Sequence, residues 1–114
     1  MRFFKCTVLT LVLAGCYYEE IPATMDRAVC LDPISYVSDI VPILNAKCNF
    51  NTCHGNNGPQ INFAIYENVE LMATEIKSRT QSGSMPKAPK PGGDLSEDQK
   101  AIIACWVDEG ALNN

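Results

Sequence analysis

The stretch Cys48-Asn49-Phe50-Asn51-Thr52-Cys53-His54 decides how the rest of this 114-residue chain is interpreted. It places two thiols with four residues between them and an imidazole directly after the second thiol. His54 is the one histidine in the sequence. Two thiols followed by a histidine can hold a prosthetic group, form a local cross-link or bind a metal ion.

Covalent haem attachment uses the pattern Cys-x-x-Cys-His, and this stretch has that pattern with two extra residues between the thiols. Both thiols can still reach one edge of the ring if the added residues loop outward, and His54 is then held over the iron. Two alternatives stay open. One is a local Cys48–Cys53 disulfide with His54 as a bystander. The other is zinc held by these three residues and one more cysteine, although adjacent Cys-His ligands are strained for tetrahedral closure.

The methionines offer a second axial ligand for such an iron. Met25 precedes the folded part, and Met72 lies on an apolar helix face and is expected in the core. Met85 lies in the proline-rich loop 83–93, where Pro86 follows it at once. We therefore expect Met85 to be the distal ligand, which would raise the reduction potential relative to bis-histidine ligation. The alternative is that Met85 plugs the core from its loop.

The N-terminus is typical of an exported chain. Arg2 and Lys5 precede a short apolar run, and the run ends in Leu13-Ala14-Gly15-Cys16. This ending resembles a bacterial lipobox, in which the cysteine is lipidated. We expect a signal peptide at 1–15, a lipidated Cys16 with a tether at 16–34, and a domain at 35–114. The alternatives are a plain signal peptide cut elsewhere or a short core helix.

The predicted location is the bacterial cell envelope, where the lipid would hold the protein to a membrane on the periplasmic side or at the outer-membrane surface. The whole chain has a net charge of −4. Removing residues 1–15 takes away two basic and no acidic side chains, which leaves about −6. Nucleic acid is excluded as a partner because phosphate binding needs a basic face. The charge is compatible with basic redox partners or simply with solubility.

Three helices are predicted, and no alternating pattern competes with them, so the fold class is all-α. The first begins near Ser38 as N-cap and leads into Cys48. The second runs from about Glu67 to Ser78 as one helix. The third starts with a capping box at Ser96 and stops at Gly110. The apolar positions that define the three faces are Val37, Ile40, Val41 and Leu44; Val69, Met72, Ala73 and Ile76; and Ile102, Ile103, Trp106 and Val107.

Cysteine parity leaves more than one pairing open. Cys6 leaves with the signal peptide and Cys16 takes lipid, so four cysteines remain in the mature chain: Cys30, Cys48, Cys53 and Cys105. If Cys48 and Cys53 attach haem, the other two are left as one pair. Four free cysteines also allow three arrangements of two disulfides.

The order of these motifs resembles the small cytochrome c domains of bacterial exported proteins, in particular the planctomycete-type cytochrome c family. The resemblance covers about residues 35–114. Its motifs are Asp39-Ile-Val-Pro-Ile-Leu44, Cys48 to Gly55, Met85-Pro86, Leu95-Ser96 and Trp106-Val-Asp-Glu-Gly-Ala111.

The resemblance implies a cytochrome c-like fold, with three main helices around a haem crevice and crossing N- and C-terminal helices. It implies one covalent haem c, with Cys48 and Cys53 as attachment cysteines, His54 as proximal ligand and Met85 as distal ligand. The crossing helices would also bring Cys30 and Cys105 together as a disulfide, unless Cys105 is a buried thiol beside Trp106.

The implied function is electron transfer to redox protein partners, without catalysis, because an iron with both axial positions filled has no place for a substrate. Trp106 is then expected in the core, and Arg79 on the surface. The alternative function is a haem-free, disulfide-stabilised helical lipoprotein that acts as a binding or structural module.

Overall fold

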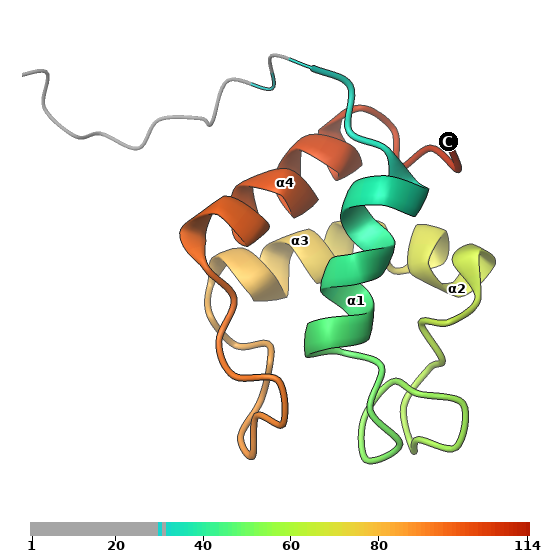
Figure 1. Cartoon of the computed structure of the whole chain (residues 1–114), viewed down its shortest axis with the longest axis vertical. Helices are drawn as coiled ribbons and strands as arrows, with labels where there is room; N and C mark the ends of the chain where they lie inside the picture. Colours follow the sequence, from blue (N-terminus) through green and yellow to red (C-terminus); the bar gives the residue numbers. More distant parts are fainter. Residues whose placement is uncertain (1–29, 31) are drawn as a thin grey trace, which may run out of the picture.

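The computed structural model describes residue 30 and residues 32–114. The predictions for the signal peptide, the lipidated Cys16, most of the tether and Met25 therefore lie outside the described residues. Within them, helices and turns are present without any strand, which confirms the all-α class. None of these helices is long and apolar enough to cross a membrane. The helical elements in chain order are η1 (Tyr36–Ile40), α1 (Val41–Lys47), α2 (Tyr66–Leu71), α3 (Ala73–Gln81) and α4 (Glu97–Asp108) (Figure 1).

The first helical segment begins earlier than the sequence predicts. Its N-cap is Ser35, whose hydroxyl accepts a hydrogen bond from the backbone N–H of Ser38 at 3.2 Å. The prediction of Ser38 as the cap was wrong, because Ser38 supplies the donor of the capping bond. A serine three residues upstream offers the same chemistry, and the apolar pattern alone did not separate the two.

The opening turn of this segment is a π-turn, in which the Val41 N–H bonds the carbonyl of Tyr36. It lies directly before Pro42, which has no N–H and whose ring would clash with the carbonyl four residues back in a regular α-helix. The wider turn shifts the helical phase. Val37, expected on the buried face, is 62% exposed, and Tyr36 is buried in its place.

The second predicted helix is divided into α2 and α3 at Met72. The backbone of Met72 (φ −97°, ψ 4°) is not helical, although its N–H still bonds the carbonyl of Asn68 at 3.1 Å. The prediction of one continuous helix from Glu67 to Ser78 was therefore wrong. The face was right, since Val69, Ala73 and Ile76 are buried.

Helix α4 follows the prediction closely. Ser96 and Gln99 form a complete capping box, with the Gln99 N–H donating to Ser96 Oγ at 3.1 Å and the Ser96 N–H donating to Gln99 Oε1 at 3.0 Å. This pair satisfies two of the backbone donors that a helix start leaves unpaired. The chain leaves the helix at Gly110, which has φ +100°.

Trp106 is the centre of the core. It is 1% exposed, its indole N–H donates to the carbonyl of Leu112 at 2.9 Å, and its ring lies 5.5 Å from that of Tyr36. The prediction of Trp106 as a core residue is confirmed. Helix α4 packs against α3 and η1, and the η1–α1 segment runs at a steep angle to α4 in Figure 1. The other buried apolar side chains come from every helical element, two loops and the segment after α4: Ile40, Ile43, Leu44, Phe63, Val69, Ala73, Ile76, Leu95, Ile103 and Ala111.

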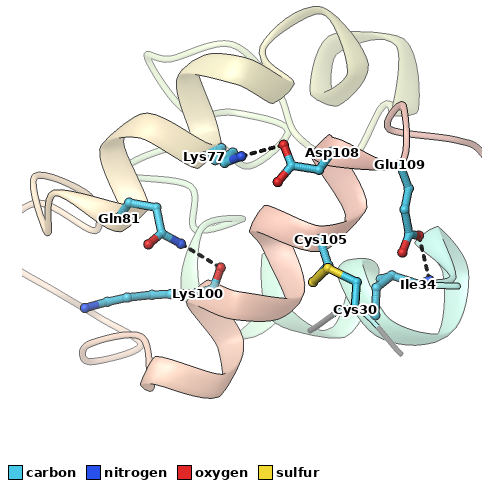
Figure 2. Close-up of a disulfide and its surroundings, with 8 residues drawn as sticks. All are labelled: Cys30, Ile34, Lys77, Gln81, Lys100, Cys105, Asp108 and Glu109. Atoms are coloured by element: carbon cyan, nitrogen blue, oxygen red, sulfur yellow. Dashed lines mark hydrogen bonds and ion pairs between the residues drawn. A yellow bond between two sulfur atoms is a disulfide. The ribbon is translucent and has the colours of Figure 1, made fainter. Parts of the chain in front are cut away.

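The start and end of the described chain are tied together beside α4. Cys30 and Cys105 form a disulfide with 5.7 Å between their Cα atoms, and this is the pair that the resemblance implied (Figure 2). The Ile34 N–H donates to Glu109 Oε2 at 2.9 Å, and the Tyr36 N–H donates to Asn114 Oδ1 at 2.8 Å. These contacts fix where the chain enters the domain.

Candidate functional site

Helix α1 delivers the first cysteine of the motif. Cys48 is the C-cap of this helix, and its N–H bonds the carbonyl of Leu44 at 2.8 Å. Leu44 is fully buried against the core, so the end of α1 is fixed in position. Cys48 is half-buried and packs against the edge of the core.

The four residues between the cysteines form a compact turn that returns to Cys48. The Cys48 carbonyl accepts from the N–H of Phe50 at 2.9 Å and from the N–H of His54 at 3.2 Å. The Cys53 N–H bonds the carbonyl of Phe50 at 2.8 Å. The longer spacer is therefore folded back on itself, and Cys48, Cys53 and His54 share one short loop at the end of α1.

Gly58 closes the next turn onto the same loop. A Cβ atom at this position would lie 2.1 Å from the carbonyl oxygen of Cys53, so only glycine allows this approach. The following backbone bond, from the Gln60 N–H to the Cys53 carbonyl, is 3.2 Å. The loop after His54 is thus held against the motif instead of projecting away from it.

Cys48 and Cys53 both remain thiols and both are half-buried. Burial, and to a smaller extent the neighbouring Cys53, raise the pKa of the Cys48 thiol from 9.0 to about 11. Cys48 is therefore neutral at physiological pH, and a neutral buried thiol is a poor nucleophile. Such a residue behaves as a small apolar side chain with a sulfur available for a covalent bond.

The ring of His54 is fixed from two sides. Its Nδ1 lies 2.9 Å from the carbonyl oxygen of Ile61, and because a carbonyl can only accept, Nδ1 carries the proton. The ring stacks on Phe63, with centroids 4.0 Å apart and planes 4° apart. In the neutral ring with this tautomer, Nε2 is the nitrogen that can ligate a metal.

Met85 lies in a second loop, between α3 and α4. It is half-buried, and its N–H bonds the carbonyl of Arg79 at 3.1 Å. Both loops extend from the same end of the helical body (Figure 1). The structure therefore groups Cys48, Cys53 and His54 in one loop and places Met85 in the other.

Gly92 ties the Met85 loop to α1. A Cβ at Gly92 would lie 2.0 Å from the carbonyl oxygen of Ala46, so this close approach requires glycine. Lys47 Nζ also donates to the Gly92 carbonyl at 2.6 Å. The second loop is therefore anchored one to two residues before Cys48.

The remaining candidates lie where the sequence predicted. Met72 is half-buried and packs against the core. Arg79 is half-exposed and pairs with Glu75 at 2.5 Å on the surface of α3. Asp108, at the end of α4, is exposed and pairs with Lys77 at 2.5 Å (Figure 2).

A zinc site has no ligand set in the described part of the chain. No three His, Cys, Asp or Glu side chains among residues 30 and 32–114 are grouped closely enough to hold a metal ion. Cys30 and Cys105, which could have supplied a fourth ligand, are joined to each other.

Sequence reasoning missed the contacts that orient the motif. Ile61, Phe63 and Gly92 were not singled out, although each fixes one part of the site. A signal was present for one of them, since a Gly-Gly pair in a proline-rich loop indicates a close backbone approach.

Comparison with known proteins does not add to this description. No family model, no curated protein and no solved structure matches the chain significantly.

Proposed function

We propose that this protein is a monohaem c-type cytochrome that carries electrons at the bacterial cell envelope, held there by lipid on Cys16. The observation that supports this most is the fixed ring of His54. With Nδ1 donating to Ile61 and the ring stacked on Phe63, Nε2 is free as a donor to iron. A histidine that ligates iron through Nε2 needs its other ring nitrogen held in this way.

The two thiols fit the same cofactor. Cys48 and Cys53 would hold haem through thioethers, because both are unoxidised, half-buried and on the loop that carries His54. The raised pKa of Cys48 disfavours a dithiol oxidoreductase, in which the attacking cysteine needs a lowered pKa.

Met85 would supply the distal ligand. Its loop is anchored to α1 at Gly92, and it emerges from the same end of the molecule as the His54 loop (Figure 1). When bound, haem supplies one-electron chemistry. The residues of this chain would hold and orient it, and with His54 and Met85 as ligands the iron would have no coordination site for a substrate.

The resemblance to small cytochrome c domains agrees with the arrangement of the helices. The steep angle between η1–α1 and α4, with Tyr36 and Trp106 at their contact, corresponds to the crossing N- and C-terminal helices that the resemblance implies. We include this cytochrome c-like arrangement in the proposal.

One observation favours the alternative function. The described core is closed by its own side chains, with Trp106, Ile40 and Leu44 each 1% exposed, and the disulfide adds a covalent tie. A haem-free, disulfide-stabilised binding or structural module would have both features. In such a module the contacts of His54 with Ile61 and Phe63 would only hold the loop in place.

The test is the visible spectrum of the protein after export in a bacterial host with a haem c maturation system. We expect a sharp α-band in the reduced protein and a pigment that acid-acetone extraction does not remove. Cys48→Ser together with Cys53→Ser should abolish the covalent pigment, and Ser82→Ala, on an exposed serine, should not. A colourless wild-type protein would contradict the proposal.

A further inference from the structure

A cleft lies beside the candidate haem site, between α1 and the segment 63–66. Its volume is about 320 Å³, which is at the lower end of the range for small-molecule sites. None of Cys48, Cys53, His54 and Met85 lines it. The cleft is therefore a second feature of the molecule, which the proposed function does not use.

Three aromatic side chains form walls of this cleft: Tyr36, Phe63 and Tyr66. The rings of Tyr36 and Tyr66 meet edge to face, with centroids 4.9 Å apart and planes at 75°. The Tyr66 hydroxyl is held by the carbonyl of Ala111 at 2.7 Å, so this ring has a fixed position. Two nearly perpendicular rings and a third aromatic wall form a corner of π-systems.

The polar lining of the cleft consists of amides and tyrosine hydroxyls, with no positive charge among them. No basic side chain lines it, while the amides of Asn45 and Asn49 do. Asn49 Nδ2 is already bonded to Asn45 Oδ1 at 2.8 Å, and Asn49 Oδ1 is buried without a donor. A cation is attracted by amide oxygens, whereas an anion would find no basic side chain in this lining.

Two carboxylates of α2 act on the tyrosines of this cleft. The pKa of Tyr36 is raised by burial first, then by Tyr66 and by the charge of Glu67. The pKa of Tyr66 is also raised by burial first, followed by Glu70 and Glu67. Glu67 and Glu70 belong to the same helix as Tyr66, so the charges that act on these tyrosines are negative.

We propose that the cleft between α1 and residues 63–66 binds a small organic cation of the quaternary or methylated ammonium class. The faces of aromatic rings attract such cations through their quadrupoles, and the attraction is strongest where several rings surround the charge. Methyl groups make the ammonium less strongly hydrated than a bare one. They can therefore contact the apolar part of the lining, which includes Leu44 and Phe63.

The position of the cleft gives the bound cation a connection to the candidate site. Phe63 lines the cleft and also stacks on His54 at 4.0 Å. A positive charge against Phe63 would lie one ring away from the proposed proximal ligand. Because only protein side chains line the cleft, we expect the cation to bind whether or not haem is attached.

Equilibrium dialysis with choline tests the proposal on the purified exported chain, with 3,3-dimethyl-1-butanol as the uncharged analogue of the same shape. We expect choline to be retained at millimolar concentration and the alcohol at least fivefold more weakly, as a cation–π contribution of roughly 1 kcal/mol implies. Equal retention of the alcohol, or no retention of choline, would overturn the proposal.

Two pairs of variants test whether choline binds in this cleft. Ala64→Trp, at an exposed lining residue, should fill the cleft and abolish retention, whereas Thr74→Trp on the exposed face of α3 should not. Glu70→Gln should weaken binding severalfold, and Glu97→Gln at the start of α4 should leave it unchanged. Equal binding by the two tryptophan variants would overturn the assignment.

A further arm distinguishes the source of the ammonium group, which can be a free solute or a lipid headgroup. If vesicles of phosphatidylcholine displace choline and vesicles of phosphatidylglycerol do not, the headgroup is a source. If neither displaces it, the cleft binds the free solute.

Discussion

Cys48 shows how one buried side chain links the site to stability. Its pKa of about 11 in the folded chain exceeds the ordinary value of 9.0, because burial and the neighbouring Cys53 both disfavour the thiolate. In a haem-free chain, the folded state then keeps its proton between pH 9 and 11, where the unfolded state loses it. Stability is unaffected by this group below pH 9 and falls as the pH rises towards 11.

We predict that the haem-free chain loses up to about 2–3 kcal/mol of unfolding free energy between pH 9 and 11 through this group. Tyrosines titrate in the same range, so the measurement is the difference between wild type and Cys48→Ser in urea unfolding at each pH. A difference that stays constant across this range would mean that Cys48 does not titrate as described.

The reduction potential of the haem-loaded protein tests whether Met85 is the distal ligand. We predict that Met85→Ala lowers the potential by on the order of 100 mV, because the loss of a thioether ligand removes the effect that raises it. Met72→Leu is the matched control and should leave the potential unchanged, since Met72 packs against the core. An unchanged potential in Met85→Ala would point to another distal ligand.

At the residue scale, the sequence indicated the candidate site residues but not the contacts that orient them. Residue type and spacing predicted Cys48, Cys53, His54 and Met85. The carbonyl of Ile61 carries no mark in the sequence, because any residue offers the same oxygen. Its position depends on how a loop of seven residues closes, which no local pattern determines.

At the scale of elements, the sequence predicted the ends of a helix correctly where nearby residues determine them. The capping box at Ser96 and the stop at Gly110 were correct because both act within a few residues. The π-turn before Pro42 and the break at Met72 were missed. In both places the apolar spacing continues without a gap, so a regular helix fits the pattern equally well.

We predict that Ser96→Ala destabilises the domain by about 1 kcal/mol, because it removes the acceptor of the Gln99 N–H at the start of α4. Ser78→Ala, on the exposed face of α3, is the control and should cause no loss. The measurement is the urea midpoint at constant m-value. A cost equal to that of the control would show that the cap contributes nothing.

The whole molecule is closed by the Cys30–Cys105 disulfide, which spans 75 residues of sequence. Its partner contacts, from Ile34 to Glu109 and from Tyr36 to Asn114, fasten the same junction. The sequence alone left several cysteine pairings open, and only the resemblance selected this one. A long-range pairing depends on which helices meet, and that is a property of the complete fold.

We predict that Cys30→Ser with Cys105→Ser lowers the unfolding free energy by about 4 kcal/mol, the loop-entropy value for a closed segment of this length. Denaturant unfolding of the double variant against wild type measures it. The same loss should appear when wild type is unfolded with reductant present. A loss well under 1 kcal/mol in both experiments would contradict a constraint of this size.

The central claim is that Cys48 and Cys53 hold haem, and the denatured mass of the exported protein tests it most directly. The chain is unfolded, alkylated without reduction and weighed intact. We predict the mass of the chain plus one haem, with no alkyl label on Cys48 or Cys53. A chain without haem that carries label on both cysteines would contradict the account and favour the haem-free module.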